Sequence, residues 1–154
     1  MQKVRARWKI YWNRRGKNAY LYGSELYFHA KDHVEFRNAL VSPGTCIMLW
    51  TSRTNFQRDH AEPELPIIDG ESSYHISVDM ETDKADGCLV RMVFRDRYGN
   101  DAGNLLVQQK EMDFSCPLKT YAYEIQLISA GASVLHFHSI TISEYDPDSQ
   151  EQTL

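Results

Sequence analysis

Hydrophobic and polar residues alternate along most of this chain, which is the two-residue period of a β-strand with one buried face. In the first segment Val4, Ala6, Trp8, Ile10 and Trp12 alternate with charged or polar neighbours. No segment shows the 3.6-residue period of an amphipathic helix. Together with short apolar runs, the alternation predicts strands over residues 3–12, 20–28, 33–37, 46–50, 74–81, 88–95, 105–109, 121–127 and 134–143.

Turn residues separate these segments and indicate how the strands are connected. Pro43-Gly44 and Asp69-Gly70 are turn signals, residues 96–100 predict a hairpin turn with Gly99 in it, and Gly23-Ser24 predicts a bulge inside the second strand. The two longest connections, 52–67 and 80–87, suit crossings between sheets. The fold class we expect is all-β: a two-sheet antiparallel β-sandwich of the jelly-roll type. Residues 1–145 would form one domain, and residues 146–154 a flexible acidic tail.

The composition places this chain among ordinary globular proteins. It has 154 residues, 42% of them hydrophobic, which is enough to build a core without metal or disulfides. Cys46, Cys88 and Cys116 lie in or beside apolar runs, so we expect three buried free thiols in a reducing compartment. Neither a signal-peptide apolar stretch nor a run long enough to span a membrane occurs, so we expect a cytoplasmic protein.

The N-terminal segment is strongly basic, whereas the rest of the chain is net negative. The first seventeen residues contain seven lysines and arginines and no acidic residue, although the whole chain has a formal charge of −4. Such a segment suits nucleic acid, anionic lipid or an acidic partner. The alternative is that these charges line a solvated edge strand and discourage aggregation. We favour the edge strand and predict no nucleic-acid binding, because seven cations on an acidic body are too few.

Motifs of catalysis and metal binding are sparse in this sequence. No nucleophile elbow, phosphate-binding glycine loop or dinucleotide fingerprint is present. His136 and His138 share one face of a strand and could ligate zinc, as in a metal-assisted hydrolase, but no third ligand is evident. Asp79, Glu81, Asp83 and Asp86 surround a turn that could hold calcium, although a solvated acidic loop explains them as well. We therefore predict no catalytic residue, no metal and no cofactor.

Aromatic residues are the stronger lead toward a binding function. Proteins hold sugars by stacking them on tryptophan or tyrosine rings, with a few polar groups placed to bond the hydroxyls. We expect Trp8 and Trp50 to be core residues, and Tyr11 and Trp12 to be exposed because they end their strand. The residues that could supply a platform are Trp8, Tyr11, Trp12, Tyr20, Tyr22, Tyr27 and Trp50.

An ordered set of segments resembles the third accessory secretory protein of the bacterial accessory Sec system, from about Ile10 to Glu144. The matching residues are Tyr20-Leu21-Tyr22-Gly23-Ser24, Pro43-Gly44, Trp50, Ser52, Asn55, Pro63-Glu64-Leu65-Pro66, Gly70, Tyr74 and Phe137-His138-Ser139-Ile140-Thr141-Ile142. The resemblance implies a fold similar to carbohydrate-binding modules. It also implies a non-enzymatic subunit that acts as adaptor or chaperone in a cytosolic complex with the first and second accessory secretory proteins.

The resemblance further implies what such a complex works on. With a dedicated SecA-type ATPase it would export unfolded, glycosylated serine-rich-repeat adhesins, with contact to their glycans and a peripheral position at the membrane translocon left open. The alternative reading is a stand-alone carbohydrate-binding module. A stiff, extended loop at Pro63 to Pro66 would suit docking, because little ordering entropy is lost on binding. The residues we predict to bind a partner or ligand are Tyr11, Trp12, Tyr20, Tyr22, Asn55, Pro63, Leu65 and Pro66.

Overall fold

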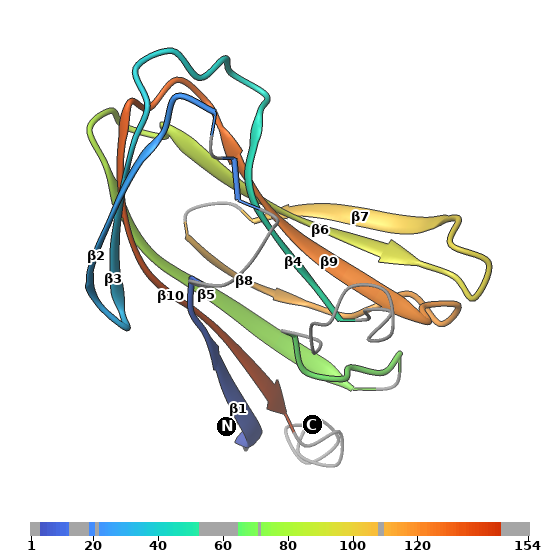
Figure 1. Cartoon of the computed structure of the whole chain (residues 1–154). Helices are drawn as coiled ribbons and strands as arrows, with labels where there is room; N and C mark the ends of the chain where they lie inside the picture. Colours follow the sequence, from blue (N-terminus) through green and yellow to red (C-terminus); the bar gives the residue numbers. More distant parts are fainter. Residues whose placement is uncertain are drawn as a thin grey trace, which may run out of the picture.

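The chain folds into two antiparallel β-sheets packed face to face (Figure 1). The structure, a computed structural model, describes residues 4–12, 19–20, 22–52, 65–70, 72–107 and 110–145. The six-stranded sheet has the order β2-β3-β10-β5-β8, with β1 also paired to β10, and the four-stranded sheet has the order β4-β9-β6-β7. The strands are β1 (Val4–Ile10), β2 (Glu25–Ala30), β3 (His33–Arg37), β4 (Cys46–Thr51), β5 (Ser73–Thr82), β6 (Cys88–Arg95), β7 (Asp101–Val107), β8 (Glu111–Phe114), β9 (Ala122–Ser129) and β10 (Val134–Tyr145).

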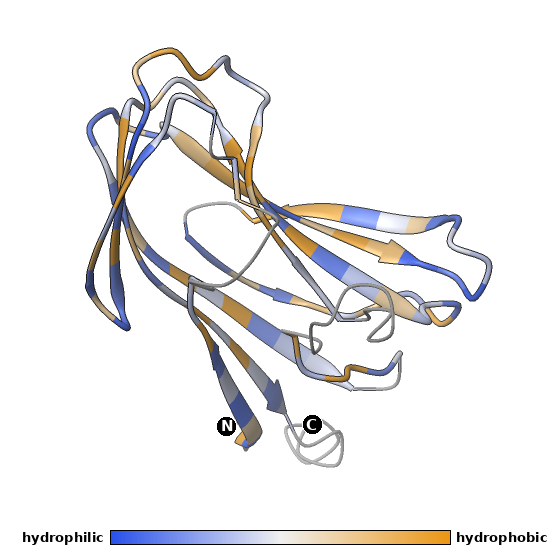
Figure 2. Ribbon diagram, in the orientation of Figure 1, coloured by the Kyte–Doolittle hydropathy of each residue, from blue (hydrophilic) through white to orange (hydrophobic). Residues whose placement is uncertain are grey.

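This architecture confirms the predicted all-β sandwich. From β3 onward the chain passes repeatedly between the sheets, and the connections after β4 and β5 are the two crossings that the sequence predicts. Hydrophobic and hydrophilic residues follow one another along the strands of both sheets (Figure 2). In β5 and β9 every second residue is buried along most of the strand, as the alternation requires.

The second strand begins later than predicted. Gly23 has a φ of +71°, a left-handed conformation that favours glycine, and it forms a turn before β2 instead of a bulge within it. The Nδ2 group of Asn38 donates hydrogen bonds to the carbonyl oxygen of Tyr22 (2.9 Å) and to Ser24 Oγ (3.0 Å) and so ties the turn to the end of β3. The bulge lies further on, between Phe28 and Ala30.

The core lies between the sheets, and its aromatic centre joins both layers. Trp12 packs against Phe36 of β3 and Phe137 of β10, with ring centroids 6.2 and 5.9 Å apart. Trp50 of β4 stacks on Phe137 at 5.3 Å, and its indole N–H donates to the carbonyl oxygen of Tyr11 at 3.0 Å. Trp50 is fully buried, as predicted, whereas Trp8 is only partly buried against this core.

The predicted exposure of Trp12 is wrong. Its side chain is 4% exposed, because the two-residue alternation continues past the end of β1 and places Trp12 on the same inner face as Ile10. The prediction of three buried thiols is also wrong for Cys46. Cys88 and Cys116 are buried, but Cys46 is exposed at the first position of β4, where the register against β9 shifts.

Candidate functional site

The predicted binding residues do not form one aromatic platform. Trp12 is buried. Tyr11 is half-buried, and the ammonium group of Lys31 lies 4.8 Å from the centroid of its ring. The backbone N–H of Tyr20 donates a 2.7 Å hydrogen bond to the carbonyl oxygen of Ile47, which holds Tyr20 against β4. Tyr22 is 84% exposed. Asn55 and Pro63 lie outside the described residues. The remaining predicted residues, Leu65 and Pro66, therefore have to be judged by the loop that contains them.

That loop is fixed at its base and exposed at its tip. Leu65 is buried in the core, and the hydroxyl of Tyr123 donates to the carbonyl oxygen of Pro66 at 2.5 Å. At the other end of the loop, the Asp69 N–H donates to the Tyr74 hydroxyl at 2.8 Å. Between these anchors Ile67 is 90% exposed.

A second loop, which lies against Gly70, carries another exposed apolar side chain. A Cβ at Gly70 would lie 3.0 Å from the backbone of Leu118, so the two loops are in contact. Leu118 is 83% exposed. We call Ile67 and Leu118 together the loop surface. The sequence singled out Pro66 but neither of these residues, although an Ile-Ile pair directly after the proline was a signal that could have been used.

A second exposed apolar pair lies at the opposite end of β10. Leu40 is 89% exposed, and the side chain of Asn38 bonds both to the backbone of Leu40 and to the backbone of Tyr22. The backbone N–H of Asn38 donates a hydrogen bond to the carbonyl oxygen of Ser133, just before β10 begins. In contrast, the loop that carries Ile67 leads into Tyr74, and Tyr74 pairs with Glu144 near the end of β10. Tyr22 and Leu40 therefore lie at one end of the sandwich, and the loop surface lies at the other.

The thiols and acidic groups of the described residues offer little for catalysis. Burial raises the pKa of the Cys88 thiol to about 11 and also raises that of Cys116, so both stay protonated and unreactive. Asp83, one of the residues considered for calcium, accepts backbone hydrogen bonds from Ser133 and Val134 at 3.0 and 3.3 Å and so fixes the start of β10. Within the described ranges no three His, Cys, Asp or Glu side chains are arranged to hold a metal ion.

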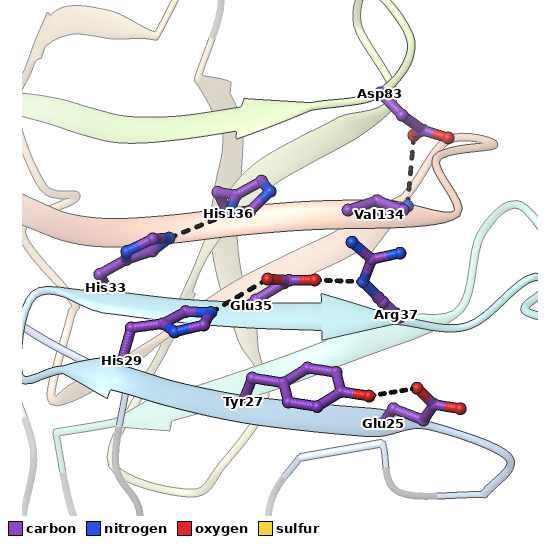
Figure 3. A network of polar contacts seen from close by, with 9 residues as sticks. All are labelled: Glu25, Tyr27, His29, His33, Glu35, Arg37, Asp83, Val134 and His136. Carbon is purple, nitrogen blue, oxygen red and sulfur yellow. Dashed lines mark hydrogen bonds and ion pairs between the residues drawn. The ribbon is translucent and has the colours of Figure 1, made fainter.

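A polar network that the sequence did not predict covers the outer face of β2, β3 and β10 (Figure 3). Its centre is Glu35, which is only 8% exposed; its carboxylate accepts hydrogen bonds from Arg37 Nε and, at 3.0 Å, from His29 Nε2. These two partners, Arg37 first, lower the pKa of Glu35 to about 2. Beside it, His33 Nε2 and His136 Nδ1 lie 3.0 Å apart. Of these residues only His136 stood out in the sequence, because the others meet it through the fold.

The low pKa of Glu35 makes the free energy of unfolding depend on pH. Because the pKa in the folded state, about 2, lies below the ordinary value of 4.5, Glu35 contributes stability above pH 4.5 that is lost as the pH falls toward 2. We expect Glu35→Gln to destabilise the protein at pH 6, and the difference in free energy of unfolding between variant and wild type to shrink steadily from pH 4.5 to pH 2.5. Urea unfolding at pH 6, 4 and 2.5 measures this. Asp113→Asn, which removes a 77% exposed carboxylate, is the control and should leave the pH dependence unchanged.

Comparison with known proteins decides the family. A family model described as "Accessory Sec secretory system ASP3" matches residues 19–144. This chain belongs to that family, the third accessory secretory proteins of the accessory Sec system. The family member of Streptococcus gordonii is 34% identical over 151 residues, covering 92% of this chain and 95% of the relative. The family member of Staphylococcus aureus is 26% identical, covering 88% of this chain but only 42% of that longer protein.

Solved structures of related chains share the fold described above. A chain of the Glycosylation Associate Protein (Gap123) complex from Streptococcus agalactiae matches with a TM-score of 0.84 and 32% identity, over 90% of this chain and 44% of that chain. A chain in the crystal structure of accessory secretory proteins 1, 2 and 3 of Streptococcus pneumoniae matches with a TM-score of 0.82 and 28% identity, over 88% and 94% of the two chains. The family resemblance seen in the sequence is therefore confirmed.

Proposed function

We propose that this chain is a non-enzymatic subunit of an accessory Sec complex and binds the first and second accessory secretory proteins. The observation that carries the proposal is the match to chains in two solved complexes, the Gap123 complex and that of accessory secretory proteins 1, 2 and 3. The exposed apolar side chains of the loop surface support it, because such side chains suit contact with other proteins. The unreactive buried thiols favour a binding role over catalysis.

Membership of the family supports a proposal for the wider setting of the complex. We propose that the assembly acts in the cytoplasm as an adaptor for unfolded, glycosylated serine-rich-repeat adhesins and delivers them to a SecA-type ATPase, with peripheral contact at the membrane translocon. The described residues contain no helix that is both long and apolar enough to span a membrane.

The stand-alone carbohydrate-binding module receives less support. Such a module needs exposed rings side by side, whereas Trp12 and Trp50 pack inside the core. Tyr22 is highly exposed, but the turn that Asn38 joins to it carries the exposed aliphatic Leu40 and not a second aromatic platform residue. We therefore assign contact with sugars to the complex that carries the adhesin, and we do not propose sugar binding as the primary function of this chain.

Co-expression with the first and second accessory secretory proteins of the same organism tests the assembly. We expect the three chains to co-elute in size-exclusion chromatography, with a mass by light scattering that equals a whole-number combination of the subunits. The control is this chain expressed alone, which should elute at its own smaller mass. If all three chains are folded and still elute separately, the resemblance is one of fold only, and titration with free glycans becomes the decisive measurement.

A further inference from the structure

Four histidines meet on the outer face of the six-stranded sheet. His33, the first residue of β3, is the hub, and its ring lies close to one histidine of β2 and two of β10. The ring centroids lie 4.6 Å from His29, 5.2 Å from His136 and 5.1 Å from His138. The last two are 103 and more residues away in the sequence, so only the fold assembles this cluster.

The cluster fastens the tip of the β2–β3 hairpin to β10. The register between β3 and β10 ends at Val34, which pairs with Phe137, so the tip at residues 30–33 lies beyond the last paired residue. Two hydrogen bonds attach it: His33 Nε2 to His136 Nδ1 at 3.0 Å, and His138 Nδ1 to the carbonyl oxygen of Asp32 at 2.7 Å. Since a carbonyl oxygen only accepts, His138 donates there.

The bond between His33 and His136 depends on protonation. In a neutral pair one nitrogen donates its proton and the other accepts it. One added proton leaves a donor and an acceptor in place, but a second turns both facing nitrogens into donors and puts two like charges side by side. The bond is then lost. The bond from His138 to Asp32 survives protonation, because a charged imidazole still donates.

Other charges around the cluster do not remove this conflict. Glu35 already accepts hydrogen bonds from Arg37 and His29, and its negative charge raises the pKa of His33 by less than the other groups lower it. Partial burial and the nearby imidazoles of His29, His138 and His136 lower the pKa of His33 below 6.5. The remaining charged or titratable groups on the neighbouring elements are Glu25 and Tyr27 on β2, Lys31 and Asp32 in the turn, Tyr11 beneath Lys31, and Asp79 and Glu81 on β5 opposite Ser139 and His136.

We propose that the four histidines form a proton-operated latch that holds the hairpin tip against β10 at neutral pH. When His33 and His136 are both protonated, the latch releases the His33 side of the tip, while the bond from His138 to Asp32 remains. The base of the hairpin stays in place, because Val34 and Phe36 are each 1% exposed and pack in the core. Release is therefore limited to the tip and to the contact between Lys31 and Tyr11. The latch makes this end of the outer face sensitive to acid in the range where histidine titrates.

Hydrogen exchange of the full chain at pH 7.5 and 5.5, with a metal chelator in both buffers, tests the latch. After correction for the intrinsic pH dependence of exchange, we expect protection of backbone amides in residues 29–33 to fall about tenfold, which is near the upper end of the effect of losing one hydrogen bond. Amides of β5 should not change. The double variant His33→Gln, His136→Asn carries side-chain amides that are not protonated in this pH range. Protection of its backbone amides at the tip should be equal at both pH values.

His75→Gln is the matched control. His75 lies in the same sheet but bonds Asp113 at 2.7 Å, away from the cluster, so this variant should keep the tenfold change. Equal protection of the wild-type tip at both pH values would overturn the latch, as would a tenfold change that persists in the double variant. Should the double variant fail to fold, NMR titration of the wild-type imidazoles replaces it. The latch requires His33 and His136 both to carry two ring protons at pH 5.5, and spectra in which either ring stays neutral there contradict it.

Discussion

Replacing Trp12 by alanine is expected to lower the free energy of unfolding by about 3–5 kcal/mol, the range measured for buried tryptophan or phenylalanine replaced by alanine. Trp12 is 4% exposed and lies between Phe36 and Phe137, which belong to two neighbouring strands. Its removal would leave a cavity beside the stacked pair of Phe137 and Trp50. Because folded domains are stable by only about 5–15 kcal/mol, this loss is large enough to threaten the fold.

Urea unfolding at neutral pH measures the effect. Tyr22→Ala is the matched control: it also removes a large aromatic ring, but one that is 84% exposed, and should change stability by less than about 0.5 kcal/mol. If the free energy of unfolding falls by similar amounts in the two variants, Trp12 is not a core residue and its placement in the structure is contradicted. A large loss in Trp12→Ala alone would also explain why Trp12 cannot serve as a sugar-stacking surface.

The strands could be predicted wherever their own sequence carried the pattern. β3 and β6 have continuous or alternating apolar residues, and their predicted ranges, 33–37 and 88–95, equal the observed ones. β8 was missed, because Glu111–Phe114 has only four residues and depends on β5 as its partner. Trp12 was misjudged because the end of a strand's hydrogen bonding was taken as the end of its buried face.

The candidate site was less predictable, since it depends on contacts between distant segments. Leu65 is buried and Ile67 is 90% exposed, yet both are apolar residues of one short loop. The difference arises from the bond between Tyr123 and the Pro66 carbonyl oxygen and from the contact of Gly70 with Leu118. No local pattern in the sequence contains that information, just as none places His33 beside His136.

The second large effect is expected at the loop surface, where Ile67→Ala should weaken assembly with the partner subunits by about 30-fold, the loss of a typical interface hot spot of about 2 kcal/mol. Ile67 is the most exposed large apolar residue described, and Leu118, which lies against Gly70 of the same loop, is 83% exposed. The loop that carries Ile67 is already held by the bonds of Pro66 and Asp69, so docking would order little new backbone. This prediction depends on the proposed complex.

Affinity measured with the purified partner subunits, for example by biolayer interferometry, gives the comparison, and circular dichroism establishes that each variant is folded. Leu40→Ala is the matched control, since Leu40 is 89% exposed but lies at the other end of β10. We expect Leu40→Ala to bind like the wild type. The opposite result, weak binding by Leu40→Ala and normal binding by Ile67→Ala, would move the docking surface to the end that carries Tyr22. Because that end is joined to β3 through Asn38, docking there would involve the turn before β2 and not the loop after Pro63.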